Sequence, residues 1–162
     1  MRIGVFSDSH GDVSNARRFY DRLAPLDCIF HLGDFAADGA KLAKLFACPV
    51  YAVRGNCDYR SDAPLELTVD LDGKRFLLLH GHQYYFSDAL LYRGEEVHAD
   101  MVLYGHTHMP DLSADGPRLL LNPGSLSRPR GGSADSCALI VTDGGDLQVR
   151  FVNADNAPGV RK

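Results

Sequence analysis

Short apolar runs alternate with polar segments along the first half of the chain, and their spacing predicts alternating strands and helices. Residues 2–7, 28–32 and 49–53 are predicted buried strands. Between them, residues from about 12 to 23 and from 38 to 47 carry apolar side chains at helical spacing. This β-α-β-α-β order predicts parallel strands joined by right-handed crossovers.

The second half of the chain has a different pattern. Residues 65–71 alternate between apolar and polar, as expected for a strand with one face in water. Asp72-Gly73 predicts a hairpin turn, with the partner strand over 74–79, and a helix is expected from Ala89 to about His98. Further strands are predicted at about 101–105, 118–121, 136–142 and 147–152. The expected fold class is therefore α/β, a four-layer α/β/β/α sandwich of two mixed sheets flanked by helices.

The length of 162 residues predicts a single domain over 1–162, with roughly the last ten residues as a tail. A net charge of −4 gives no electrostatic reason to expect binding to nucleic acid or to anionic membranes. No apolar run approaches the roughly 20 residues that span a bilayer. The four cysteines have no C-x-x-C spacing, and the first residues do not resemble a signal peptide. We therefore expect a protein of the reducing cytoplasm, without a membrane partner.

Polar residues suited to metal binding follow five of the predicted strands. Open α/β sheets bind ligands beyond the carboxyl ends of their strands, so these side chains are expected to meet there. Carboxylates mixed with imidazoles suit Mn²⁺, Fe or Zn²⁺ better than Ca²⁺ or Mg²⁺, which prefer oxygen alone. The sequence therefore predicts a polynuclear metal site, and the candidate ligands are Asp8, His10, Asp34, Asn56, His80, His106 and His108.

Each of these motifs is weak by itself. An Asp-x-His pair such as Asp8 and His10 arises often by chance, and an isolated histidine more often packs or lies on the surface. The spacing i, i+2, which recurs in His106 and His108, does let both side chains reach one ion in extended chain. The force of the prediction lies in five such motifs in this order, each after a predicted strand.

Taken together, these segments resemble the signature blocks of the calcineurin-like metallophosphoesterases. A further segment, Asn122-Pro123-Gly124-Ser125, is similar to a block of the small single-domain prokaryotic phosphodiesterase branch, which is related to the phosphoesterase-fold subunit of retromer. The resemblance extends from residue 1 to about residue 152. The five signature blocks are Asp8-Ser9-His10, Gly33-Asp34, Gly55-Asn56-Cys57-Asp58, His80-Gly81-His82 and Gly105-His106-Thr107-His108.

The resemblance implies two divalent ions, with manganese favoured and iron, zinc or nickel as alternatives. It assigns one ion to Asp8, His10, Asp34 and His108. It assigns the other to Asp34, Asn56, His80 and His106, so that Asp34 bridges the two. The expected activity is that of a phosphodiesterase acting on a small soluble phosphate ester. A hydroxide held between the ions would attack phosphorus directly, without a phosphorylated enzyme.

Four further residues near these blocks are candidates for catalytic roles. Cys57 stands where the wider superfamily has a histidine, and a thiol is a poorer proton donor than an imidazolium at neutral pH. The enzyme would then favour good leaving groups or use another donor, unless Cys57 merely fills space. Asp58 either orients a neighbour or forms a turn, and His82 is expected to line the site. Arg130, with Arg128, either binds phosphate or is simply solvated.

Other functions remain open from the sequence. The retromer relative suggests a non-catalytic, metal-binding scaffold, but a scaffold predicts eroded ligands, and every ligand position here is filled. A phosphomonoesterase or a protein phosphatase is a rival within the enzyme class, although the chain lacks the long insertions that a surface for docking proteins would need. A nuclease is disfavoured by the acidic balance. Self-association is a further expectation, because small members of this branch often self-associate.

Overall fold

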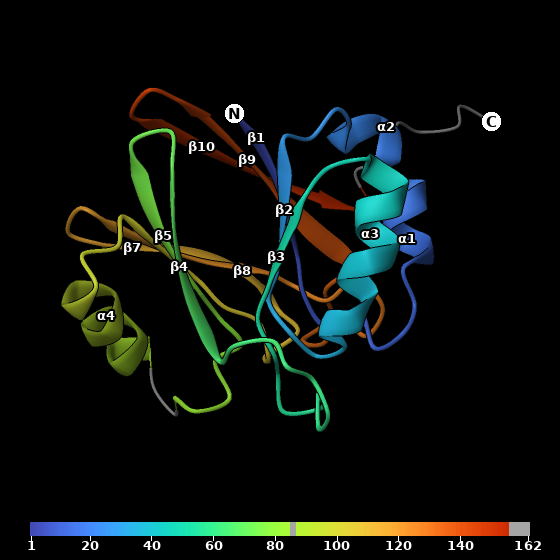
Figure 1. Ribbon diagram of the computed structural model, residues 1–162, viewed down its shortest axis with the longest axis horizontal. Coiled ribbons are helices and arrows are strands. Elements are labelled where there is room, and N and C mark those ends of the chain that lie inside the picture. The colour runs from blue at the N-terminus through green and yellow to red at the C-terminus, as the bar shows by residue number, and fades with distance from the viewer. Residues whose placement is uncertain (85–86, 156–162) are drawn as a thin grey trace.

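Two five-stranded sheets packed face to face form the centre of the molecule. The computed structural model describes residues 1–84 and 87–155. One sheet has the strand order β10-β9-β1-β2-β3, and the other has the order β4-β5-β6-β8-β7 (Figure 1). The strands of the first sheet are β1 (Arg2–Phe6), β2 (Cys28–His31), β3 (Val50–Ala52), β9 (Ser136–Asp143) and β10 (Asp146–Asn153). Those of the second are β4 (Glu66–Leu71), β5 (Lys74–Leu79), β6 (Met101–Leu103), β7 (Pro110–Asp115) and β8 (Arg118–Pro123).

Helices cover the outer face of each sheet, which completes the predicted four layers. The first sheet carries α1 (Ser14–Arg18), α2 (Tyr20–Leu23) and α3 (Gly39–Phe46), and the second carries α4 (Ser87–Glu96) (Figure 1). A 3₁₀ helix, η1 (Ala36–Asp38), leads into α3. The α/β/β/α prediction is therefore confirmed. The parallel pairing of β1 with β2 and of β2 with β3 also follows the predicted β-α-β-α-β order.

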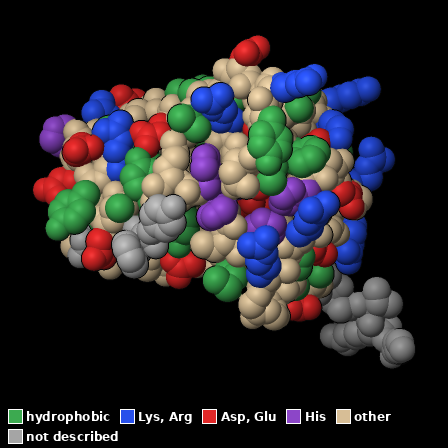
Figure 2. Space-filling view, turned by 90° about the horizontal axis from the view of Figure 1, so that it is seen from below, with side chains coloured by type: hydrophobic (Ala, Val, Ile, Leu, Met, Phe, Trp, Pro, Cys, Tyr) green, Lys and Arg blue, Asp and Glu red, His purple; other side chains and the backbone are tan. Residues whose placement is uncertain are grey.

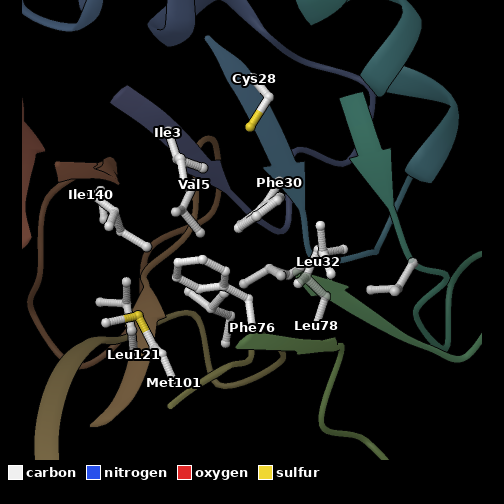
Figure 3. Packing of buried hydrophobic residues seen from close by; sticks show 14 residues of the cluster. Ile3, Val5, Cys28, Phe30, Leu32, Phe76, Leu78, Met101, Leu121 and Ile140 are labelled. Carbon is white, nitrogen blue, oxygen red and sulfur yellow. The ribbon is translucent and has the colours of Figure 1, made fainter. Parts of the chain in front are cut away.

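Alternation along the buried strands divides their side chains between two cores. In β1, Ile3 and Val5 point between the sheets, whereas Phe6 packs under the helices. In β5, Phe76 lies between the sheets and Leu77 faces α4. Figure 3 shows this inner core, in which the rings of Phe76 and Phe30 lie 5.5 Å apart between their centroids. Because both faces of β1 and β5 are buried, these strands read as continuous apolar runs.

Two details of the predicted elements were wrong. The helix expected over residues 12–23 is divided at Phe19 into α1 and α2. Strand β7 was missed, because it is a largely exposed edge strand whose side chains gave no apolar alternation. A turn at Gly116 joins β7 to β8 as an antiparallel hairpin.

The expected tail falls mostly on residues 156–162, which lie outside the described residues. Within residues 1–84 and 87–155, no helix is both long and apolar enough to cross a membrane.

Candidate metal centre

The carboxyl ends of the central strands meet at one edge of the molecule and bring the predicted ligands together. Asp8 and His10 follow β1, Asp34 follows β2, and His80 follows β5. Figure 2, viewed onto this edge, shows histidine side chains gathered at the centre with acidic atoms beneath them and cationic side chains beside them. The convergence predicted from the sequence is therefore observed.

Four side chains form what we call the first ligand group: Asp8, His10, Asp34 and His108. Each offers a ligand atom, and these atoms all lie within 4.8 Å of one another. His108 Nε2 lies 3.1 Å from Asp8 Oδ1 and 3.4 Å from His10 Nε2. His10 Nε2 lies 3.7 Å from Asp34 Oδ2. Nitrogens and oxygens that face each other at this spacing can hold one metal ion between them.

Three more side chains form the second ligand group: Asn56, His80 and His106. His80 Nε2 lies 3.2 Å from Asn56 Oδ1 and 3.3 Å from Asp34 Oδ1. The rings of His80 and His106 lie 5.2 Å apart between their centroids. Asp34 therefore contacts His10 with one carboxylate oxygen and His80 with the other, and it lies between the two groups.

The backbone at this edge is strained in a way that points to function. Asp8, His10, Asp34, His106 and His108 all have left-handed backbone, with φ between 46° and 66°. Non-glycine residues adopt this conformation uncommonly, and such strain gathers at functional sites.

Close packing of backbone against the ligands explains two of the glycines. A Cβ at Gly55 would lie 2.2 Å from Asp34 Oδ1, and one at Gly105 would lie 2.0 Å from Ser7 Oγ. Only glycine allows the backbone to pass this close to the carboxylates.

Backbone carbonyls fix the orientation of two of the histidine rings. His80 Nδ1 lies 2.7 Å from the carbonyl oxygen of Leu32, and His108 Nδ1 lies 2.6 Å from that of Arg128. A carbonyl can only accept, so Nδ1 carries the proton in both rings and Nε2 keeps a free lone pair. This is the arrangement by which proteins prepare histidines as metal ligands.

The carboxylate of Asp8 provides a test of whether a cation fits here. Asp8 is fully buried, and its Oδ2 accepts hydrogen bonds from Ser7 Oγ at 2.6 Å and from the His106 N–H at 3.2 Å. Its Oδ1 is buried without a hydrogen-bond partner. Burial tends to raise the pKa of Asp8, but His108, His80 and Ser7 outweigh burial and lower that pKa. A buried, ionised oxygen with no donor is the chemistry of a metal ligand, so the donor set fits a metal ion.

A buried polar network supports the first ligand group, and the sequence did not reveal the part that Asp38 plays in it. Asp38, which is 3% exposed, accepts hydrogen bonds from Ser9 Oγ at 2.7 Å and from the Gly11 N–H at 2.8 Å. Lys41 Nζ lies 2.6 Å from its other oxygen. Ser9 Oγ also lies 3.1 Å from Nε2 of the fully buried His31. Ser9 separates two ligands, so this network holds the loop that carries both.

The carboxylate of Asp58 supports the loop of the second ligand group. It accepts hydrogen bonds from the Ala36 N–H and the Gly55 N–H, both at 2.8 Å. Cys57 donates its own N–H to Asp34 Oδ1 at 2.9 Å. Asp58 thus contacts loop backbone rather than a ligand side chain, and it ties the segment after β2 to the segment that carries Asn56.

A cavity of about 400 Å³ opens at the metal centre, and it contains most of the remaining candidates. Its lining includes Cys57, Arg128 and Arg130 together with ligand side chains from both groups. Burial, followed by the neighbouring carboxylates, raises the pKa of the Cys57 thiol to about 11. His82 lies beside His80, with ring centroids 5.5 Å apart, and its Nδ1 is buried without a partner. His82 does not line this cavity.

Sheet order, layering and a histidine-rich edge together define a metal-binding α/β sandwich. The profile of the calcineurin-like phosphoesterase superfamily domain matches residues 1–145 of the chain. The chain belongs to this family, as the sequence motifs predicted.

Curated relatives and solved structures agree with this assignment. The chain is 32% identical over 155 residues to YsnB of Bacillus subtilis, which is named a probable metallophosphoesterase. The matched region covers 93% of this chain and 90% of the relative. It is 31% identical over 172 residues to phosphodiesterase YfcE of Escherichia coli K12, with 88% and 89% covered.

A structure from Streptococcus pneumoniae, described as a predicted phosphoesterase, has a TM-score of 0.78 at 33% identity and covers 95% of this chain and 90% of its own. Vps29 of Entamoeba histolytica, solved with zinc, has a TM-score of 0.77 at 21% identity, with 94% and 99% covered, and shares the fold.

Proposed function

We propose that this protein is a dinuclear metal-dependent phosphodiesterase that hydrolyses a small soluble phosphate ester. One observation carries the proposal: the first and second ligand groups meet at Asp34, whose two carboxylate oxygens face one group each. A carboxylate with both oxygens directed in this way suits a bridge between two ions.

The chemistry of the ligands supports manganese, with iron, zinc or nickel as alternatives. Zinc is the metal named with the Vps29 structure. Two bound ions would supply Lewis acidity toward the phosphoryl oxygens and a water of lowered pKa as nucleophile. We further propose that phosphorus passes directly to water, without attachment to a side chain. A phosphorylated protein trapped by acid quenching during turnover would contradict this.

Residues of the chain would bind the phosphoryl group and hold the ligands in position. Arg128 and Arg130 line the same cavity as the ligands, where guanidinium groups can bind phosphoryl oxygens. Ser7 Oγ and the His106 N–H hold the Asp8 carboxylate in place. His108, His80 and Ser7 lower the pKa of Asp8 against the opposing effect of burial, so the carboxylate stays ionised. Burial of Asp8, Asp34, His80 and His108 excludes water that would weaken these electrostatic contacts. We also keep the single-domain organisation and a cytoplasmic location as proposals.

The decisive experiment is a metal-reconstitution screen. Protein stripped by a chelator is reloaded with Mn²⁺, Fe²⁺, Zn²⁺ or Ni²⁺ and assayed with matched phosphomonoesters and phosphodiesters. We expect metal-dependent hydrolysis that is faster for the diesters. Faster hydrolysis of monoesters would make the protein a phosphomonoesterase. No hydrolysis with any metal would favour a non-catalytic scaffold.

A further inference from the structure

A second cavity adjoins the metal centre on the side of Cys57. It has a volume of about 390 Å³, and Cys57 lines both this cavity and the one that holds the ligands. The two cavities therefore share Cys57 as a lining residue. A molecule whose phosphoryl group lies at the ligands can extend past Cys57 into the second cavity.

The walls of the second cavity are small and largely apolar. Ala36, Ala37, Ala52 and Ala63 contribute no side-chain atoms beyond a methyl group. Asp58 also lines the cavity, but both of its carboxylate oxygens already accept backbone N–H groups. A lining of methyl groups suits a flat, apolar group rather than a second phosphate or a hydrated sugar.

An aromatic side chain at the rim adds to this chemistry. Tyr59 lines the cavity and is 91% exposed, more than any other large hydrophobic side chain that the structure describes. The adjacent Arg60 places a guanidinium on the same lining. Both side chains can stack on an aromatic ring, because aromatic faces and guanidinium planes attract one another and other π-systems.

We infer that this cavity is a subsite for a flat aromatic ester group, either a nucleobase or a simple aryl ring, of the phosphate ester bound at the metal centre. The inference rests on the proposed function and names the substrate class more closely. The aromatic group lies against Tyr59 and the alanine methyl groups. The phosphoryl group lies across Cys57, beside the ligands and Arg130.

Binding calorimetry on the Mn²⁺-loaded protein tests the subsite without relying on turnover. The probes are inorganic phosphate and two matched pairs: adenosine 5′-monophosphate against ribose 5-phosphate, and phenyl phosphate against methyl phosphate. Stacking of one base on an aromatic side chain changes affinity by about tenfold or more, so we expect the aromatic member to bind about tenfold more tightly. A preference in the nucleotide pair alone assigns a nucleobase, and a preference in both pairs assigns any aryl ester.

Two variants remove the subsite in different ways. Tyr59→Ser deletes the stacking ring, and Ala37→Leu, at an exposed position, fills the cavity from its wall. Each should abolish most of the aromatic preference and leave the affinity for inorganic phosphate unchanged. Tyr92→Ser, which removes a 70% exposed tyrosine on α4, is the matched control and should retain the preference.

The outcomes separate this inference from the proposed function. Equal affinity within each pair for the wild type overturns the subsite. A preference that survives both Tyr59→Ser and Ala37→Leu overturns it as well, and places the ring elsewhere, such as beside the half-exposed Phe35. An aromatic preference without any hydrolysis would support the subsite and contradict the phosphodiesterase. Failure of every probe to bind would overturn the subsite, whereas the proposed function is tested separately by hydrolysis of the phosphodiesters.

Discussion

The first and second ligand groups are held by the same kind of hydrogen-bonded support, which different parts of the chain provide. In each, a carboxylate that is not itself a predicted ligand accepts two hydrogen bonds from segments that carry ligands. Asp38 accepts from Ser9 Oγ and the Gly11 N–H, and Asp58 accepts from the Ala36 N–H and the Gly55 N–H. Such supporting partners orient the ligands, and mutation of one typically lowers metal affinity or activity by about 10- to 100-fold.

The two supports differ in burial and in reach. Asp38 is buried, and its network of polar contacts extends through Ser9 to His31 and, on the other side, to Lys41. Asp58 is only partly buried, and it lines the cavity beside Cys57. The first ligand group also contains two carboxylates, whereas the second adds a neutral amide and two imidazoles to the shared Asp34. The first group is thus the more rigid and the more negative, and we expect it to bind metal first.

Removing the shared ligand, Asp34, should impair metal binding by both ligand groups. Asp34→Asn takes away the charge that faces both His10 and His80. We expect the activity to fall by about a thousandfold or more, because neither ion is then held in place to stabilise the transition state. Steady-state kinetics and metal content after dialysis measure the two effects.

A matched change far from the site controls for the loss of one negative charge. Asp146→Asn alters an exposed carboxylate on β10 and should retain full activity and metal content. If Asp34→Asn kept two bound ions and near-normal turnover, the shared-ligand arrangement would be wrong.

The support of the first group should make the fold sensitive to acid. Burial lowers the pKa of His31 from the ordinary 6.5 to about 4. Between these pH values the unfolded chain binds a proton that the folded protein does not. The free energy of unfolding should therefore fall as the pH drops from 6.5 to 4, by about 3 kcal/mol from this residue.

Denaturant unfolding of metal-free protein across this pH range measures the effect. His31→Gln keeps a donor toward Ser9 but cannot titrate, so its stability should depend less on pH. His98→Gln, at an exposed histidine, should behave as the wild type. Identical acid slopes for His31→Gln and the wild type would remove His31 as the cause.

The two supporting carboxylates should affect different steps of metal binding. Asp38→Asn should weaken the first ion bound, and Asp58→Asn the second, each by about 10- to 100-fold. Calorimetric titration with Mn²⁺ separates the steps, and circular dichroism checks that both variants are folded. Equal weakening of both steps by either variant would show that the groups are not supported independently.

The strands and the seven predicted ligands could be found from the sequence because they follow local rules. Apolar runs ending in Asp, Asn or His are visible one strand at a time, and open sheets bring such ends together. The strand β7 was not visible, because its pattern is polar and its pairing with β8 depends on the edge of a sheet already formed.

The supporting residues could not be found in the same way. Asp38 contacts Ser9 across 29 residues of chain, and nothing local marks it. A buried Asp at the start of a predicted helix reads as an ordinary capping residue. Cys57 was found only because a resemblance supplied a histidine for comparison, and its position between two cavities comes from the structure alone.

Cys57 lies beside the second ligand group, and its replacement should have the smallest effect. With its pKa raised to about 11, first by burial and then by the nearby carboxylates, the thiol is a weak proton donor at neutral pH. Cys57→His places a better donor at the boundary between the two cavities. We expect turnover of diesters with poor leaving groups to rise a few-fold, with little change for nitrophenyl esters, which need no proton. Cys57→Ser adds no better acid, so the ratio of turnover on poor leaving groups to turnover on nitrophenyl esters should stay near the wild-type value. If Cys57→His and Cys57→Ser gave the same ratio, Cys57 would only fill space, and proton donation would have to come from elsewhere in the cavity.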